Sequence, residues 1–123
     1  FPGSYSYDST ITISTALGTT EVYNGIGQMR IVTQHNSDTL SIIKAPLSLL
    51  MTEKTHEFKA VVSGNMLKIV PYTDVYPTGL TNTNLEITGG DVIMRSDNLV
   101  QINEEFRTAL GSTGTIVTYA ERN

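Results

Sequence analysis

Apolar and polar residues alternate along much of the chain, and this alternation constrains the fold more than any other feature. Near the amino terminus Tyr5, Tyr7 and Ile11 fall on odd positions, while hydroxyl residues such as Ser6 and Thr10 fall on even ones. A period of two residues with many β-branched side chains is typical of a strand that buries one face. We therefore predict that the first two thirds of the chain form antiparallel strands.

Turn-forming residues divide this region into successive strands. Turns are predicted at Asn24-Gly25, over 35–38 and at Gly64-Asn65, because Gly, Asn, Asp and Ser favour tight turns. The pair Gly89-Gly90 is interpreted as a bulge within a strand, and residues 73–83 are predicted to form the longest exposed loop. The predicted strands cover residues 5–14, 21–23, 29–34, 39–44, 56–63, 66–72 and 84–94.

The pattern changes after residue 96. The apolar residues are now mostly three or four positions apart: Leu99, Ile102, Phe106, Ala109 and Leu110. This spacing is typical of the apolar face of a helix, with Ser96 or Asp97 as an N-terminal cap and Gly111 as a stop. The sequence thus predicts a helix over 99–110, followed at 113–120 by either a strand or a final helical turn.

These elements together predict an α+β fold in a single domain over residues 1–123. The predicted layout is six or seven antiparallel strands followed by one helix near the carboxyl end. One helix covers only part of a sheet, so we expect the apolar stripe of the helix to pack against a second copy of the chain. The predicted dimer interface consists of Leu99, Ile102, Phe106 and Leu110.

Composition argues against most catalytic chemistry. The chain has no cysteine and only two histidines, His35 and His56, which excludes disulfides and thiolate metal sites. His56 is interpreted as a surface histidine, and Glu104 and Glu105 as part of the solvated face of the helix. No apolar run approaches the roughly 18 residues of a membrane span. We therefore predict no enzyme activity, no metal or other cofactor, no small-molecule substrate and no membrane partner.

Basic residues gather in the middle of the chain. The net charge is −4, but residues 39–73 contain four lysines against two glutamates. Lys44, Lys59 and Lys68 fall on three successive predicted strands, and strands about 4.8 Å apart bring side chains of matching parity into one row that could contact a phosphate backbone. The alternative is that these lysines only solvate an exposed sheet face. The candidate contacts are Ser41, Lys44, Lys54, Lys59 and Lys68.

The order of the predicted elements resembles the coat proteins of single-stranded RNA bacteriophages, the leviviruses. The resemblance is carried by the strand 85–94, the helix 99–110, the Val117-Thr118 stretch and the strands of the amino-terminal half. It implies an amino-terminal β-hairpin, an antiparallel sheet of about five strands and a C-terminal helix that interlocks with a dimer partner. It also implies a virion coat protein that dimerises, self-assembles into an icosahedral capsid in the bacterial cytoplasm and binds single-stranded RNA. On this resemblance the five candidate contacts become RNA-binding residues.

Two other classes fit parts of the sequence. The main alternative is a secreted fimbrial subunit, a pilin assembled by donor-strand exchange, in which residues 5–13 would be the donor strand and Phe1 would follow a cleaved signal peptide. The predicted helix over 99–110 counts against this alternative, because such pilins end in a strand. A β-sandwich sugar-binding module is the third interpretation, supported by the strand content.

Overall fold

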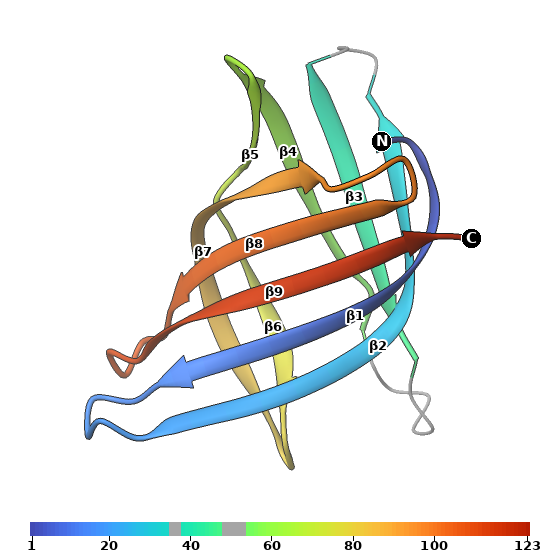
Figure 1. Cartoon of the computed structure of the whole chain (residues 1–123). Helices are drawn as coiled ribbons and strands as arrows, with labels where there is room; N and C mark the ends of the chain where they lie inside the picture. The colour runs from blue at the N-terminus through green and yellow to red at the C-terminus, as the bar shows by residue number, and fades with distance from the viewer. Residues whose placement is uncertain (35–37, 48–53) are drawn as a thin grey trace.

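The computed structural model describes residues 1–34, 38–47 and 54–123, and these residues form strands and turns (Figure 1). The predicted turn over 35–38 lies mostly outside the described residues. Within them there is no helix that could span a membrane. The strands are β1 (Gly3–Ser14), β2 (Thr20–Thr33), β3 (Thr39–Pro46), β4 (His56–Ser63), β5 (Met66–Ile69), β6 (Tyr72–Thr78), β7 (Thr81–Met94), β8 (Leu99–Arg107) and β9 (Thr113–Arg122).

The strands form one antiparallel sheet that closes on itself. Each strand pairs with the next in sequence except β5 with β6, β1 pairs with β9, and β5 pairs with β7. β5 and β6 act as one bent strand, because both pair with β7 in a single register, with Lys68 opposite Asp91 and Tyr72 opposite Ile87. The bend lies at Pro71, which cannot donate a backbone hydrogen bond. The result is a closed, eight-stranded up-and-down barrel.

The α+β prediction and the predicted helix are therefore wrong, because residues 99–107 form strand β8. The inner face of β8 consists of Val100, Ile102, Glu104 and Phe106, all buried. Glu104 interrupts the inner alternation, and the spacing that predicted a helix combines Ile102 and Phe106 with Leu99 at the start of the strand and Leu110 in the following turn. The prediction of about five strands in the sheet is also wrong, because β8 and β9 pair with each other and complete the barrel.

The residues of the predicted dimer interface do not form a shared ridge. Ile102 and Phe106 are 0% and 3% exposed and face the core of their own barrel, whereas Leu110 is 91% exposed in the turn after β8. Leu99 is half-buried at the start of the strand. Ile102 and Phe106 are thus covered within one subunit, whereas Leu110 is not.

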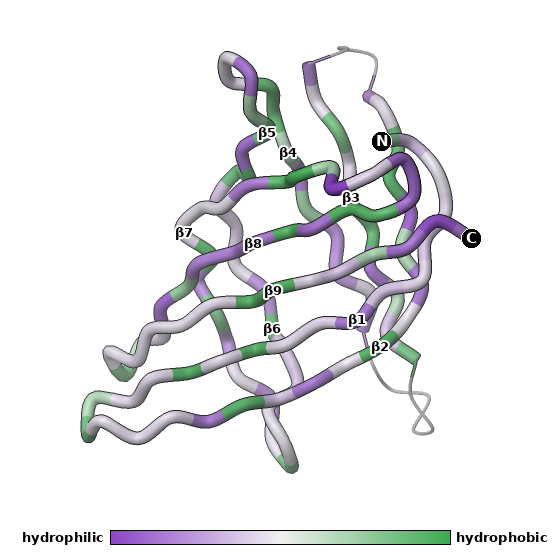
Figure 2. The backbone as a smooth tube through the Cα atoms, viewed as in Figure 1, coloured by the Kyte–Doolittle hydropathy of each residue, from purple (hydrophilic) through white to green (hydrophobic). Residues whose placement is uncertain are grey.

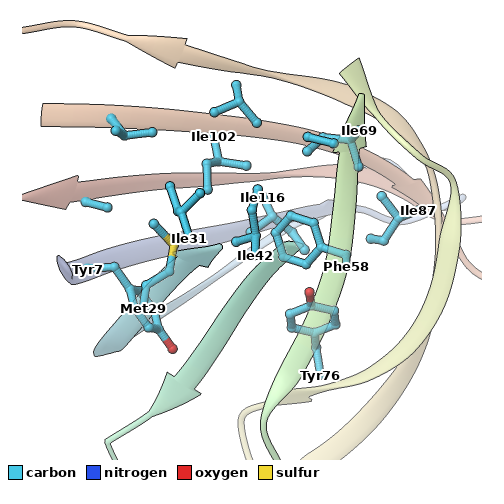
Figure 3. Packing of buried hydrophobic residues seen from close by; sticks show 14 of the residues in the cluster. Tyr7, Met29, Ile31, Ile42, Phe58, Ile69, Tyr76, Ile87, Ile102 and Ile116 are labelled. Carbon is cyan, nitrogen blue, oxygen red and sulfur yellow. The ribbon is translucent and has the colours of Figure 1, made fainter. Parts of the chain in front are cut away.

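Alternation places the core on the inside of the barrel. Hydrophilic and hydrophobic residues follow one another along the strands (Figure 2). The residues of β1 expected to be buried, Tyr5, Tyr7, Ile11 and Ile13, are confirmed as buried. Isoleucines from four different strands meet in the interior (Figure 3): Ile31, Ile42, Ile102 and Ile116.

Two glycines make room for aromatic rings inside the barrel. Gly27 lies opposite Tyr7, and a Cβ atom at Gly27 would lie 2.7 Å from the Tyr7 ring and 2.3 Å from the Ala45 carbonyl oxygen. Gly114 lies opposite Phe106, and a Cβ atom there would lie 2.5 Å from that ring. Each ring therefore occupies the space that a neighbouring side chain would need.

The smaller sequence predictions had mixed outcomes. The turn at Gly64-Asn65 and the bulge near Gly89 are confirmed, the latter by a register shift between β7 and β8. The turn at Asn24-Gly25 is wrong, because β2 continues through it in register with β1. The long loop over 73–83 is also wrong, because β6 and β7 form a hairpin there.

Candidate ligand pocket

A pocket of about 580 Å³ opens into the barrel between the ends of β2, β3 and β6. Eight strands leave an interior that side chains can just fill or that can hold one small ligand, and this volume lies within the range of small-molecule sites. The wall is largely apolar and aromatic and includes Ile11, Ile26, Tyr76 and Ile116. Polar side chains also reach the pocket: Ser9, Lys44 and His56.

Lys44 is the central polar group of this pocket. It follows Leu40 and Ile42 on the inner face of β3 and is 2% exposed. Its ammonium donates hydrogen bonds to Ser9 Oγ at 2.9 Å and Thr118 Oγ1 at 3.0 Å, and it lies 4.9 Å from the centre of the Tyr7 ring. Lysine is almost never fully buried unless a charge pairs with it. The groups that contact the Lys44 ammonium therefore show whether it is still able to bind an anionic group.

No carboxylate contacts this ammonium within the described part of the chain, where the ion pairs join other groups. Burial lowers the pKa of Lys44 to about 8, and the through-space attraction of Glu104 opposes this shift. Lys44 is therefore mostly charged at neutral pH, and its direct described partners are two neutral hydroxyls and an aromatic ring. Such a cation attracts an anionic or strongly polar oxygen.

A second buried network begins at the pocket wall and ends at Glu104, which is 1% exposed. The hydroxyls of Tyr76 and Tyr72 are 2.7 Å apart, and Tyr72 donates to Glu104 Oε2. Burial raises the pKa of Glu104, although the charge of Lys44 and the bond from Tyr72 oppose the shift. Burial also raises the pKa of both tyrosines. Hydrogen bonds thus connect the pocket to a carboxyl group deep in the barrel.

The third polar group is His56 with Asp74, and it lies between β4 and β6, which do not pair with each other. The rings of His56 and Tyr76 stack with their centres 4.1 Å apart, and those of Phe58 and Tyr72 stack at 5.0 Å. His56 Nδ1 lies 2.9 Å from Asp74 Oδ2. Burial lowers the pKa of His56, partly against the effect of Asp74. A neutral His56 that donates from Nδ1 to Asp74 fits this arrangement.

Asp74 is held by donors on several sides. Lys54 Nζ lies 2.9 Å from Asp74 Oδ1, and the backbone N–H of Val75 donates to the same oxygen at 2.8 Å. Burial favours the neutral acid, but the hydrogen bonds from His56, Lys54 and Val75 outweigh it and lower the pKa of Asp74. The carboxylate therefore fixes the ring of His56 at the pocket.

The structure separates the five residues predicted to contact RNA. Lys44 points into the barrel, whereas Lys59 and Lys68 are exposed on its outer surface. Ser41 is opposite Lys59 in the ladder but is buried and bonded to the Gln34 side chain. Lys54 is exposed and contacts Asp74. The predicted row of three lysines on one sheet face does not exist, because Lys44 has the opposite orientation.

Sequence reasoning missed most residues of the pocket. His56 is 3% exposed rather than at the surface, and Glu104 is buried rather than on a solvated face. Ser9 gave a usable signal, since it shares odd parity with Tyr7 and Ile11 on β1. Thr118, Tyr72 and Tyr76 come from segments whose structure was predicted incorrectly or left open.

Comparisons with known proteins bear on the fold. The chain is similar to the monomer form of the M. tuberculosis PknI sensor domain, with a TM-score of 0.52 and 13% sequence identity over 100% of this chain and 87% of that one. At this identity the likeness shows a shared fold alone. No protein-family model and no curated protein matches the sequence. The resemblance to levivirus coat proteins is wrong, because the structure is a barrel without the expected helix.

Proposed function

We propose that this barrel binds a small molecule whose oxygen acceptor group contacts Lys44 and whose apolar or aromatic body fills the rest of the pocket. The observation that carries the proposal is a buried ammonium at a pocket of about 580 Å³, with no described carboxylate in contact with it. A protein gains nothing in stability from such a charge, because its desolvation costs free energy that neutral partners only partly offset. A hydrogen bond from the Lys44 ammonium to an acceptor group of a ligand would offset this cost.

The surroundings of Lys44 favour a ligand with one polar end. Ser9, Lys44 and His56 supply the polar contacts, while Ile11, Ile26 and other apolar side chains line the remaining wall. A carboxylate, sulfonate or carbonyl oxygen fits the hydrogen-bond donors of an ammonium. Ligand sites typically combine a mainly apolar wall with a few placed polar groups, and this pocket has that composition.

The earlier predictions of assembly do not favour another function. The likeness to a helix-containing viral capsid protein is wrong, because the structure is an all-β barrel. Capsid assembly, pilin assembly, the homodimer, the virion localisation and the absence of enzyme activity are not tested by the fold. They stay predictions of the sequence, and the pocket supports a binding role independently of them.

The experiment is a titration of the folded chain with the anionic aromatic dye 1-anilinonaphthalene-8-sulfonate, followed by its fluorescence. We expect saturable binding with one dye per chain. Lys44→Met keeps a long unbranched side chain but removes the donors, and it should weaken binding about 10- to 100-fold, the value of a hydrogen bond to a charged group. Lys59→Met is the matched control, because Lys59 is exposed outside the barrel. Equal weakening in both variants, or none in either, would contradict the proposal.

A further inference from the structure

The Lys44 amine has the geometry of a nucleophile. A neutral amine has two N–H donors and one lone pair. The hydroxyls of Ser9 and Thr118 lie 2.9 and 3.0 Å from Nζ, so both donors have an acceptor when the amine is neutral. These two hydroxyls also bond each other at 2.7 Å, which fixes their positions. The lone pair is then left for a group in the pocket that Lys44 lines.

The same surroundings stabilise a positively charged nitrogen at this place. The Tyr7 ring centre lies 4.9 Å from Nζ, within the range of a cation–π interaction. The carboxyl group of Glu104 acts on Lys44 through space without contacting it. A protonated imine keeps one N–H and the charge of an ammonium, so the ring and the carboxylate stabilise it as they stabilise lysine.

We propose that Lys44 forms an imine with an aldehyde that occupies the pocket. This inference rests on the proposed function and names its ligand class. The Nζ lone pair attacks the carbonyl carbon, and the carbonyl oxygen takes a proton to give a carbinolamine. The nitrogen keeps one of its two hydrogens in the carbinolamine, having passed the other to that oxygen. The hydroxyl then takes a proton from solvent, the C–O bond breaks, water leaves, and the nitrogen lone pair forms the C=N bond of a protonated imine. One aldehyde, one neutral amine and one proton thus give one protonated imine and one water, with no oxidation or reduction.

The burial of Lys44 favours this reaction in two ways. A pKa of about 8 leaves about 10% of the amine neutral at pH 7, several hundred times the neutral fraction of an ordinary lysine. Desolvation of a lysine in an apolar pocket is an established route to such nucleophiles. The Lys44 side chain is also shielded from bulk water, because it is 2% exposed, and such shielding slows hydrolysis of the imine.

The test is reductive trapping on the intact chain. Protein, benzaldehyde and cyanoborohydride are mixed at neutral pH, and the product is analysed by intact mass and peptide mapping. We expect one benzyl group on Lys44 before any on the other described lysines, Lys54, Lys59 and Lys68, or on the Phe1 amine. Faster labelling of any of these amines than of Lys44 would overturn the proposal. This result comes from the wild-type chain, so it does not depend on a variant folding.

Two controls separate this inference from the proposed function. Lys59→Met should be labelled like wild type, and Lys44→Met should lose the first benzyl group. Benzaldehyde without reductant is also tested as a competitor of the anilinonaphthalene dye. If it displaces the dye but Lys44 stays unlabelled, the pocket binds small molecules and the imine proposal fails. If the dye does not bind in a saturable way, the proposed function fails whatever the labelling shows.

Discussion

The burial of Lys44 predicts an unusual dependence of stability on pH. The pKa of Lys44 falls from 10.5 in an unfolded chain to about 8 in the barrel. Between these values the unfolded chain holds more protons than the folded one, so the free energy of unfolding rises with pH. The full effect is about 3 kcal/mol, at about 1.4 kcal/mol per pH unit. From pH 7 to about pH 9.5 the expected rise is about 2 kcal/mol.

Other titratable groups limit the pH range over which the free energy of unfolding rises. Burial raises the pKa of Tyr72 and Tyr76 above 10.0, so above about pH 10 the unfolded chain loses tyrosine protons that the folded chain keeps, and stability falls again. Burial also raises the pKa of Glu104, which makes stability fall as the pH rises above 4.5, the ordinary pKa. The Lys44 contribution is therefore obtained as the difference between wild type and Lys44→Met.

The assay is urea unfolding followed by circular dichroism at several pH values from 7 to about 9.5, the window worked out from the linkage relation. Wild type should gain about 2 kcal/mol relative to Lys44→Met across this range. Lys59→Met should keep the wild-type slope, because its side chain is exposed. A wild-type chain and a Lys44→Met chain with parallel pH profiles would refute the reasoning.

Two further predictions concern the barrel itself. Phe106→Ala should lower the free energy of unfolding by about 3–5 kcal/mol, because Phe106 is 3% exposed. Leu110→Ala should change it by less than about 0.5 kcal/mol, because Leu110 is 91% exposed. Similar losses for the two variants in urea unfolding would mean that β8 is misplaced. Gly27→Ala should cost about 1–3 kcal/mol, since its Cβ would lie 2.3 Å from the Ala45 carbonyl oxygen, and Gly25→Ala, with open space around it, should be close to neutral. A Gly27→Ala chain as stable as Gly25→Ala would contradict the described packing of Tyr7 over Gly27.

The sequence was sufficient to predict strands where the alternation was uninterrupted. β1, β3 and β4 have regular inward apolar residues, and each was predicted close to its observed place. Local turn signals were less reliable. Asn24-Gly25 lies inside β2 because Asn24 pairs with Thr10 and Gly25 with Ser9 along the β1–β2 ladder. Long-range pairing therefore overrode a strong local preference.

The carboxyl-terminal third could not be predicted by alternation, and the reason is the site itself. Glu104 stands at an inner position of β8 because the barrel contains a buried polar network with Tyr72 and, through space, Lys44. A polar residue at a core position removes one apolar member from the pattern. Ile102 and Phe106, together with Leu99 at the start of the strand and Leu110 in the following turn, then have a helical spacing. The glutamate that interrupts the strand pattern is thus a member of the buried polar network.

Lys44 was singled out by the sequence for the wrong reason. Its strand has three inward positions, Leu40, Ile42 and Lys44, and parity alone places the lysine on the apolar face. The prediction of a lysine row compared parity between strands but did not compare Lys44 with Leu40 and Ile42 on its own strand. Ring stacking between β4 and β6 could not be foreseen, because it depends on the bend at Pro71 that separates β5 from β6.

The most direct test of the account is where a ligand binds on the folded chain. Two-dimensional amide NMR spectra of the protein, recorded during titration with the anilinonaphthalene dye, report this position. The account predicts shifts concentrated around the pocket, at Ser9, Lys44, His56 and Tyr76. Shifts concentrated instead on the outer surface of β4 and β5, around Lys59 and Lys68, would contradict it.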